Sequence, residues 1–165
     1  MKRSRLIAIT AAASFLLIVS GPAGAFDPAD LQRLLSSKYC PGCDLNIAPL
    51  AGANLNGANL KNALLNSANL SGSDLGAALL GGAKMSSAVL AGAKMGASDL
   101  RSAVLDSAYM TGANLSGANL GSASLRNANL TGANISGANF VGAPLGGATW
   151  VDGRVCSPGS VGVCK

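Results

Sequence analysis

The chain has 165 residues, 12 of them basic and 7 acidic, which is enough length for a single domain. It contains no histidine, so the usual general base that activates a serine or cysteine nucleophile is missing. No cluster of aspartates suggests a metal site and no glycine motif suggests phosphate binding, so we expect neither an enzyme nor a bound cofactor.

Residues 1–25 have the features of a signal peptide. Basic residues open the segment, a mostly apolar stretch follows at 6–20, and Ala23-Gly24-Ala25 offers a small-x-small cleavage site. Cleavage after Ala25 predicts an exported protein, periplasmic or secreted, with no membrane span left; the lumen of thylakoids is the equivalent place in a photosynthetic source. The alternative is an uncleaved anchor. Cleavage also removes three of the 12 basic residues, so the mature chain gives no support for nucleic-acid binding.

Residues 26–42 are predicted to form a cap made of a short helix and a CxxC turn. The helix should run from Phe26 to Tyr39, with Asp27 as N-cap, Pro28 at the first helical position and Asp30 completing a weak capping box. Its expected apolar face consists of Leu31, Leu34 and Leu35. We expect this face to cover the first coil of the region that follows, although a helix that docks a partner is an alternative.

Residues 43–150 repeat a five-residue pattern, Ala-Asn-Leu-x-Gly, as in Ala53-Asn54-Leu55-Asn56-Gly57. Neither a helix nor a strand places every fifth residue on one side, so the chain must turn within each repeat. Alanine and leucine two residues apart fit a short strand, and the glycine position fits a corner. The pattern therefore predicts stacked coils of parallel strands, which is a solenoid.

The Ala-(Asn/Asp)-Leu-x-x run resembles the pentapeptide-repeat family. The resemblance covers residues 43–150 and implies an all-β solenoid, a right-handed quadrilateral parallel β-helix with four repeats per coil. Such a helix would have roughly five and a half coils and a length on the order of 25 Å. The central leucines and the alanines two residues earlier would fill its core.

The residue before each central leucine should point outward, and asparagine dominates this position at both ends of the repeat region. In the middle, apolar residues replace it. With four repeats per coil, residues twenty apart stack on one side, which groups Leu64, Lys84 and Val104 and, on the neighbouring side, Val89 and Tyr109. An exposed apolar patch of this kind predicts a surface for a protein partner or for self-association. The alternative is a scatter of surface apolar residues.

Residues 151–165 are predicted to form a C-terminal cap closed by a disulfide, with Trp150 as a lid on the last coil. The four cysteines lie at opposite ends of the expected rod, so geometry favours two local bonds, Cys40–Cys43 and Cys156–Cys164. A CxxC pair can also be redox-active or half of a zinc site. A thioredoxin-like site would need it at the start of a helix, whereas here it follows one.

Three classes of function can be weighed against these features of the chain. An enzyme lacks the residues it needs. Some members of the family mimic DNA and bind type II topoisomerases, but that role needs a strongly negative rod in the cytoplasm, and this chain has neither feature. The remaining class is a non-catalytic structural or protein-interaction module of the cell envelope, acting as a scaffold or binding rod.

Overall fold

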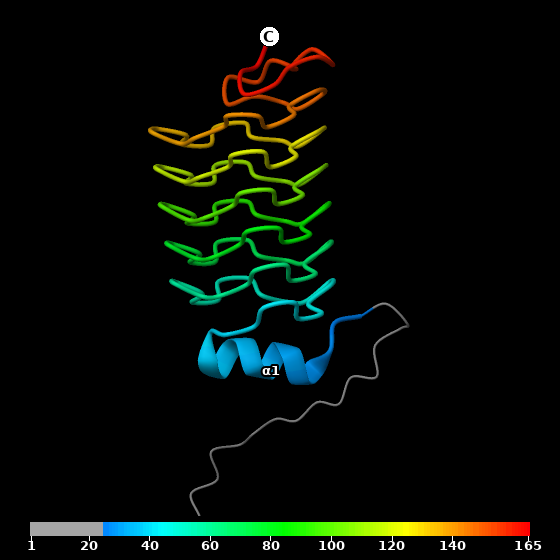
Figure 1. The fold of residues 1–165 in the computed structure, drawn as a ribbon, viewed down its shortest axis with the longest axis vertical. Helices are drawn as coiled ribbons and strands as arrows, with labels where there is room; N and C mark the ends of the chain where they lie inside the picture. The colour runs from blue at the N-terminus through cyan, green and yellow to red at the C-terminus, as the bar shows by residue number, and fades with distance from the viewer. Residues whose placement is uncertain (1–24) are drawn as a thin grey trace, which may run out of the picture.

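The fold is a rod of stacked coils with a helix across one end and an irregular tail at the other (Figure 1). The structure is a computed structural model that describes residues 25–165. The predicted signal peptide, apart from Ala25, lies outside the described residues. Within them, no helix is both long and apolar enough to cross a membrane.

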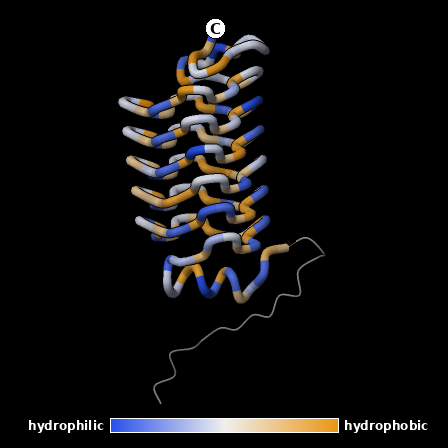
Figure 2. The backbone as a smooth tube through the Cα atoms, viewed as in Figure 1, coloured by the Kyte–Doolittle hydropathy of each residue, from blue (hydrophilic) through white to orange (hydrophobic). Residues whose placement is uncertain are grey.

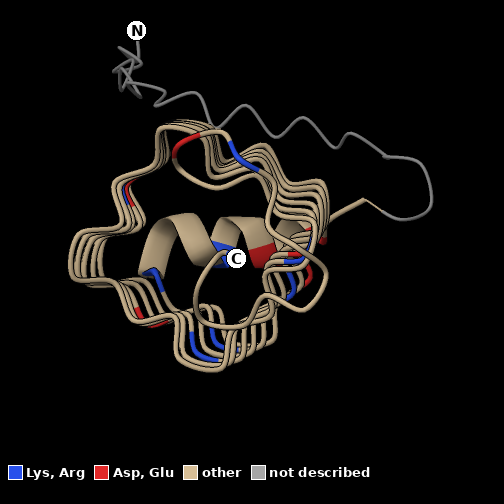
Figure 3. Ribbon diagram, turned by 90° about the horizontal axis from the view of Figure 1, so that it is seen from above, with Lys and Arg blue, Asp and Glu red and all other residues tan. Residues whose placement is uncertain are grey.

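The coils are held together by isolated parallel β-bridges between residues twenty apart, from Tyr39–Asn59 at the start to Asn129–Thr149 at the end. Seen along its axis the rod has a four-sided outline (Figure 3). We name the sides by their bridge-position residues. Side 1 carries Asp44, Leu64, Lys84, Val104, Ser124 and Pro144. Side 2 carries Pro49, Asn69, Val89, Tyr109, Asn129 and Thr149. Side 3 carries Asn54, Asp74, Lys94, Asn114 and Asn134. Side 4 carries Tyr39, Asn59, Leu79, Asp99, Asn119 and Asn139.

Each side pairs with the coil above through one residue, rather than through the three-residue strand that the pattern suggested. On side 3, the Asp74 N–H donates to Ala53 O at 2.9 Å, and the Leu55 N–H donates to Asp74 O at 2.7 Å. The same pair of bonds recurs along the rod, because every repeat presents an acceptor and a donor two residues apart. A regular ladder results although each strand segment is very short.

A single core runs along the rod axis. The central leucines and the alanines two residues before them are almost all fully buried, and the hydrophobic positions recur at the same place in successive coils (Figure 2). Ser73 and Ser98 occupy two of the alanine positions, and their hydroxyl groups donate to Leu70 O at 2.7 Å and Met95 O at 2.8 Å. Both buried hydroxyl groups at these alanine positions are therefore satisfied by hydrogen bonds, as buried polar groups generally are.

The corners explain the glycine position. In each corner the third residue of the turn has a positive φ, as a type II turn requires. At the first corner the Ala48 N–H donates to Leu45 O at 3.0 Å across the turn. Many corners use glycine, but Ile47 adopts a φ of 61° as well. The ladder above and below therefore imposes this conformation even on a β-branched residue, for which it is unfavourable.

The helix at the N-terminal end, α1 (Pro28–Ser37), is shorter than the expected 26–39. Asp27 is its N-cap and accepts from the Ala29 N–H at 2.8 Å. The expected apolar face is only partly correct: Leu34 is fully buried, but Leu35 is 52% exposed. The helix lies across the end of the rod, so a narrow stripe of its surface meets the first coil.

The tail after Trp150 reverses direction and pairs antiparallel with the last coil. Val155 bridges to Thr149 on side 2, and Val161 bridges to Pro144 on side 1. Trp150 is half-buried, and its ring meets Phe140 edge-on with ring centroids 5.4 Å apart. The C-terminal cap therefore covers two of the four sides.

Candidate functional site

The structure brings the five residues of the predicted interface onto two adjacent sides. Bridges connect Leu64 to Lys84 and Lys84 to Val104 on side 1, and Val89 to Tyr109 on side 2. Leu64, Val89 and Val104 are half-buried, whereas Lys84 and Tyr109 are exposed, Tyr109 by 55%. We call these five residues the central patch.

The corner between the two columns of the patch is polar. Asn66 donates from its side-chain amide to Asn46 Oδ1 at 3.0 Å, and its own Oδ1 accepts from the Ser86 N–H at 3.1 Å. Asp106 continues this stack, accepting from the Arg126 N–H at 2.9 Å. The central patch is therefore two apolar columns on either side of a hydrogen-bonded corner, rather than one continuous apolar sheet.

The outward asparagines have a structural role that sequence reasoning missed. On side 2, Asn69 Oδ1 accepts from the Ser71 N–H at 3.2 Å, and Asn129 Oδ1 accepts from the Thr131 N–H at 3.0 Å. Each side chain thus bonds the backbone amide two residues on, which faces the corner. The sequence did contain a signal for this role, because each asparagine stands two residues before the corner N–H that it bonds. Stacked amides such as Asn139 Nδ2 and Asn119 Oδ1, 3.1 Å apart, add a second bond.

Val89 and Tyr109 interrupt this arrangement on side 2. The N–H groups that asparagine would bond at these positions belong to Ala91 and Thr111, and among residues 25–165 neither has a hydrogen-bond partner. Local structure therefore favours asparagine at both positions, yet the chain carries apolar and aromatic side chains there. Leu79, Lys94 and Val104 leave the corner N–H groups of Gly81, Gly96 and Asp106 without a partner in the same way among the described residues. Val89 and Tyr109 are the two such positions that are stacked directly on one side.

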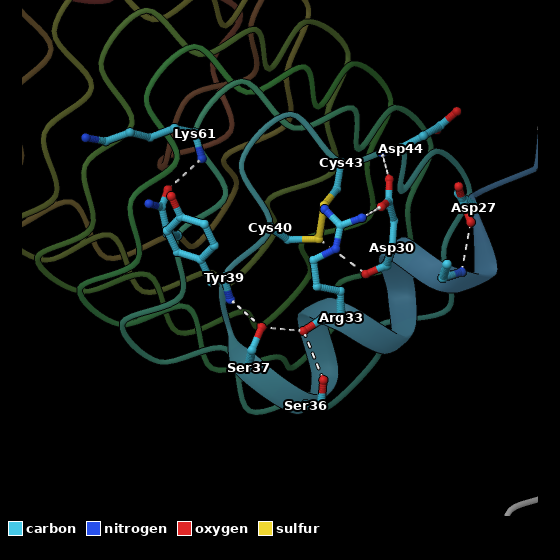
Figure 4. The surroundings of a disulfide bond; sticks show 12 residues. Asp27, Asp30, Arg33, Ser36, Ser37, Tyr39, Cys40, Cys43, Asp44 and Lys61 are labelled. Atoms are coloured by element: carbon cyan, nitrogen blue, oxygen red, sulfur yellow. Dashed lines mark hydrogen bonds and ion pairs between the residues drawn. A yellow bond between two sulfur atoms is a disulfide. The ribbon is translucent and has the colours of Figure 1, made fainter.

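The CxxC turn forms a structural joint with α1 (Figure 4). Cys40 and Cys43 are bonded at 2.01 Å, and Arg33 Nη1 lies 3.6 Å from Cys43 Sγ. Asp30 forms an ion pair with Arg33 at 2.6 Å and accepts from the Asp44 N–H at 2.7 Å. The expected capping box at Asp30 is therefore wrong, because this carboxylate serves the first coil instead of the Asp27 N–H. That amide donates to Asp44 O at 2.9 Å.

This joint also contains the one possible set of metal ligands in the described chain. One ligand atom each from Asp30, Cys40 and Cys43 lies within 4.8 Å of the others. Both sulfur atoms are in a disulfide and are not thiolates, and thiolates are what zinc binds. The ion pair with Arg33 further neutralises the carboxylate. The geometry fits a structural anchor for α1.

At the other end, Cys156 and Cys164 are bonded at 2.10 Å and close the tail into a loop. A shallow hollow of about 280 Å³ lies beside this loop, lined by Arg126, Asn127, Gly146, Gly147 and Pro158. Of these lining residues only Arg126 is ionisable. The hollow offers no pair of groups for acid–base or nucleophilic chemistry.

Charges are spread over the rod without an acidic or basic stripe (Figure 3). On side 3, Asp74 bridges directly to Lys94. The backbone N–H of Gly76 and the side chain of Asn56 lower the pKa of Asp74 from its ordinary value of 3.8. On side 4, the bond from the Arg101 guanidinium lowers the pKa of Asp99. The same contact, with oxygen and nitrogen 2.8 Å apart, raises the pKa of Arg101.

Comparison with known proteins agrees with the repeat geometry. A family model described as pentapeptide repeats in 8 copies matches residues 43–82, 83–121 and 113–149. No curated protein matches the chain in a sequence search.

Solved structures of similar proteins have the same repeat. The pentapeptide repeat protein Rfr23 from the cyanobacterium Cyanothece 51142 is 30% identical, over 67% of this chain and 88% of that chain, with a TM-score of 0.59. A pentapeptide repeat protein from the thylakoid lumen of Arabidopsis thaliana is 24% identical, over 69% and 85% of the two chains, with a TM-score of 0.50. The second likeness concerns the fold alone.

QnrB1, a plasmid-mediated fluoroquinolone resistance protein, is 22% identical over 66% of each chain with a TM-score of 0.39, which is too distant to inform function. The matched family and its structures imply a right-handed β-helix solenoid. From the repeat register, the buried leucine core and these matches, the chain belongs to the pentapeptide-repeat family.

Proposed function

We propose that this chain is an exported, non-catalytic protein-interaction module of the cell envelope, whose β-helix presents the central patch to a protein partner. The observation that carries the proposal is the pair Val89 and Tyr109. Both replace an asparagine that would bond the backbone amide at the adjacent corner, as Asn69 and Asn129 do on the same side. Residues that give up a local hydrogen bond and keep apolar area at the surface, as half-buried Val89 and exposed Tyr109 do, are candidates for function.

The chemistry of the patch indicates what kind of surface it fits. Tyr109 offers a large ring at low entropic cost together with a hydroxyl group, which is typical of residues at protein interfaces. Half-buried Val89 lies next to it on side 2, and half-buried Leu64 and Val104 add apolar area across the corner on side 1. Exposed Lys84 lies between Leu64 and Val104. A protein surface with an apolar area and one acidic side chain would match this pattern.

The distribution of charge supports a protein partner over a role as a DNA mimic. A DNA mimic needs closely spaced negative charges along one side. In the described chain, acidic residues are interspersed with basic ones, for example Asp74 beside Lys94 and Asp99 beside Arg101. Export, which the basic and apolar segment at 1–25 indicates, would also separate the protein from cytoplasmic topoisomerases.

Export can be tested directly. The protein should be expressed with residues 1–25 in its source organism, and the N-terminus of the form recovered from the envelope fraction should be sequenced. We expect the recovered form to begin at Phe26. A protein that starts at Met1 and stays in the cytoplasm would contradict this part of the proposal.

Binding can be tested with the double variant Val89→Asn and Tyr109→Asn. The new asparagines can bond the Ala91 and Thr111 amides, so the variant should be at least as stable as the parent. Crosslinking in envelope extract, followed by mass spectrometry, should show a specific partner that the parent captures and the variant loses. Leu79→Asn, at the same repeat position on the opposite side 4, is the matched control and should keep that partner.

The two measurements together decide between function and folding. Loss of the partner with unchanged or higher thermal stability supports the central patch as a binding surface. Equal capture by the parent, the double variant and the Leu79→Asn control would refute it. A change in the mass of the purified protein alone would instead identify the patch as a contact between copies.

A further inference from the structure

The corner between sides 1 and 2 ends in the hollow beside the tail. In each lower coil this corner carries two side chains, from Asn46 and Ile47 in the first coil to Arg126 and Asn127. The last coil has two glycines there instead. The hollow of about 280 Å³ lies at these two uppermost levels, and we call it the corner hollow. Its lining consists of Arg126, Asn127, Gly146, Gly147 and Pro158.

The two glycines are required by close neighbours. A Cβ atom on Gly146 would lie 2.5 Å from Pro158 O, and a Cβ atom on Gly147 would collide with Asn127 Oδ1. The tail on one side and the coil below on the other therefore leave room only for glycine. As a result, no side chain from the last coil enters the corner hollow, and the backbone of Gly146 forms part of its surface.

The N–H of Gly146 lacks the acceptor that lower coils supply at this corner. There, a corner side chain accepts from the corner N–H one coil above. Asn66 Oδ1 accepts from the Ser86 N–H at 3.1 Å, and Asp106 Oδ1 accepts from the Arg126 N–H at 2.9 Å. The side chain of Arg126 has no acceptor atom, and the Gly146 N–H has no hydrogen-bond partner among residues 25–165. Other corner N–H groups are unpaired too, but this one lines a hollow together with a cation.

The guanidinium of Arg126 is held in place from below. Its Nη1 donates to Ser124 Oγ at 2.9 Å, and the Ser124 hydroxyl donates to Asp106 Oδ1 at 2.5 Å. The Nε and Nη2 atoms have no partner within the described chain. A guanidinium fixed at one nitrogen loses less freedom on binding and keeps further donors for a carboxylate. The corner hollow therefore combines a charged donor with a backbone donor.

Two acceptors face the same hollow. Pro158 O and Asn127 Oδ1 lie against the two glycines, and neither accepts a hydrogen bond from any residue that the structure describes. A ligand that fills the corner hollow can satisfy donors and acceptors together only if it carries both kinds of group. An acidic oxygen next to an N–H group meets this requirement.

We propose that the corner hollow binds a carboxylate whose neighbouring carbon carries an amide N–H. This group occurs at the C-terminal end of a peptide and in N-acyl amino acids. One carboxylate oxygen accepts from the Gly146 N–H, as Asp106 Oδ1 does from the Arg126 N–H one coil below. The other oxygen faces the Arg126 guanidinium, and the amide N–H donates to Pro158 O. No residue of the central patch lines this hollow, so the site is independent of the proposed function.

The charge and size of the corner hollow favour a carboxylate over a phosphate or sulfate. Arg126 is the one ionisable lining residue, and its support Ser124 is bonded to the carboxylate of Asp106. A doubly charged anion would meet a single cation that is partly offset by this carboxylate. Because the hollow is small and shallow, we expect a dissociation constant on the order of 1 mM for a ligand of this size.

The site can be tested by nuclear magnetic resonance on the purified, isotope-labelled protein with its disulfides intact. Titration with N-acetylglycine should shift the Gly146 amide signal in a saturable way. N-acetylglycinamide, which lacks the carboxylate, should leave this signal unchanged at the same concentrations. Absence of a saturable shift at Gly146, or an equal shift with the amide, would overturn the proposal. These ligand comparisons use the parent protein and depend on no variant.

Two sources of the ligand can then be distinguished. N-acetyl-triglycine has the same terminal group on a longer chain. Tighter binding of this peptide than of N-acetylglycine would identify the end of a peptide as the ligand. Equal binding would identify a small N-acyl amino acid, because the rest of the peptide would then make no contact. Either result supports the carboxylate site, whereas binding of neither compound would refute it.

Arg126→Asn separates binding from folding. It removes the guanidinium and supplies an amide oxygen that can accept from the Gly146 N–H, as Asn66 does for Ser86. Thermal stability should therefore stay the same or rise, while N-acetylglycine should bind at least about tenfold more weakly. Arg101→Asn, at the same position of another corner, is the matched control and should bind as the parent does. Parent-like binding by Arg126→Asn would contradict the assignment.

Discussion

The two ends of the rod are closed in different ways. At the N-terminal end α1 lies across the first coil, and both backbone groups of Asp44 are paired, with Asp30 and with Asp27. On side 2 the lowest position is Pro49, which has no N–H to leave unpaired. On side 3 the Lys38 ammonium donates to Asn54 Oδ1 at 3.0 Å. Sides 1, 2 and 3 of this end therefore each have their own means of protection.

The C-terminal end is closed on two sides only. Its tail pairs with sides 1 and 2, while the backbone of residues 133–142 on sides 3 and 4 has no partner of this kind among the described residues. An unprotected strand edge recruits other strands unless charge, proline or a covering element prevents it. The contrast teaches that one solenoid can have a covered strand edge at one end and a partly open strand edge, able to pair further, at the other.

The largest expected effect on stability comes from weakening the contact between α1 and the first coil. Leu34→Ala removes the fully buried contact between α1 and the first coil and should lower the free energy of unfolding by about 2–5 kcal/mol. Chemical denaturation monitored by circular dichroism measures it. Leu35→Ala, one residue away but 52% exposed, is the control and should change stability by less than about 0.5 kcal/mol. Equal effects would mean that α1 does not seal the rod as described.

The next effect concerns the half-closed end. Replacing Cys156 and Cys164 with serine should destabilise the protein by roughly 2–3 kcal/mol, because the short loop they close would gain freedom in the unfolded chain. The freed tail should also expose the edge of sides 1 and 2, so we expect aggregation to increase. Thermal unfolding and light scattering measure the two consequences. A variant as stable and as soluble as the parent would show that the tail holds its place without the disulfide.

A smaller effect on the free energy of unfolding should have opposite signs at the two ends of the rod, where glycine and isoleucine are exchanged at a corner. Ile47, in the first coil, has a φ of 61° and is exposed, so Ile47→Gly should stabilise the protein by about 0.5–1 kcal/mol by relieving backbone strain. Gly132, in the last coil, has a φ of 69° with space around it, so Gly132→Ile should destabilise the protein by a similar amount. Denaturant titration of both variants provides the measurement. The same sign for both would show that crowding, not backbone conformation, decides at these corners.

The smallest effect lies between the ends, where charge replaces capping as the stabilising contact. The pKa of Asp99 is lowered below 3.8 in the folded protein, chiefly by the side chain of Arg101. Its contribution to stability is therefore present above about pH 4 and is lost as the pH falls through the lower folded pKa. Asp99→Asn should flatten this acid decline slightly, and thermal unfolding between pH 2 and 6 would show it. Arg101→Gln, which removes the cause, should flatten it too; if it does not, another contact controls the carboxylate.

The coil could be predicted from sequence because every repeat has the same short strand, the same corner and the same buried central position. The period of five, the small residues at the corners and the apolar central position predicted the turns. The resemblance to the pentapeptide-repeat family supplied four repeats per coil, and the stacking of Leu64, Lys84 and Val104 followed from that number. The pairing of cysteines at each end followed from the length of the rod between them. These features depend on contacts between residues at a fixed separation.

Features outside the repeat could not be predicted in the same way. The exposure of Leu35 depends on how α1 is rotated against the coil, and both leucines satisfy the same helical spacing. The Asp27 amide was the expected local partner of Asp30. The Asp30 carboxylate instead accepts from the Asp44 N–H, which would otherwise be an unpaired donor at the end of the coil. The tail after Trp150 has no period, so the two sides it covers emerge only from the folded chain.

The spacing of twenty residues between stacked positions gives the rod an angular scale. Adding or removing one five-residue unit would leave the core and the ladder intact but would turn everything beyond it by a quarter of a circle. The direction in which the tail faces, relative to α1 and the central patch, is therefore determined by how many units lie between them. Gain or loss of whole repeats would swivel one surface against the other in discrete steps, while insertions of other lengths would break the coil.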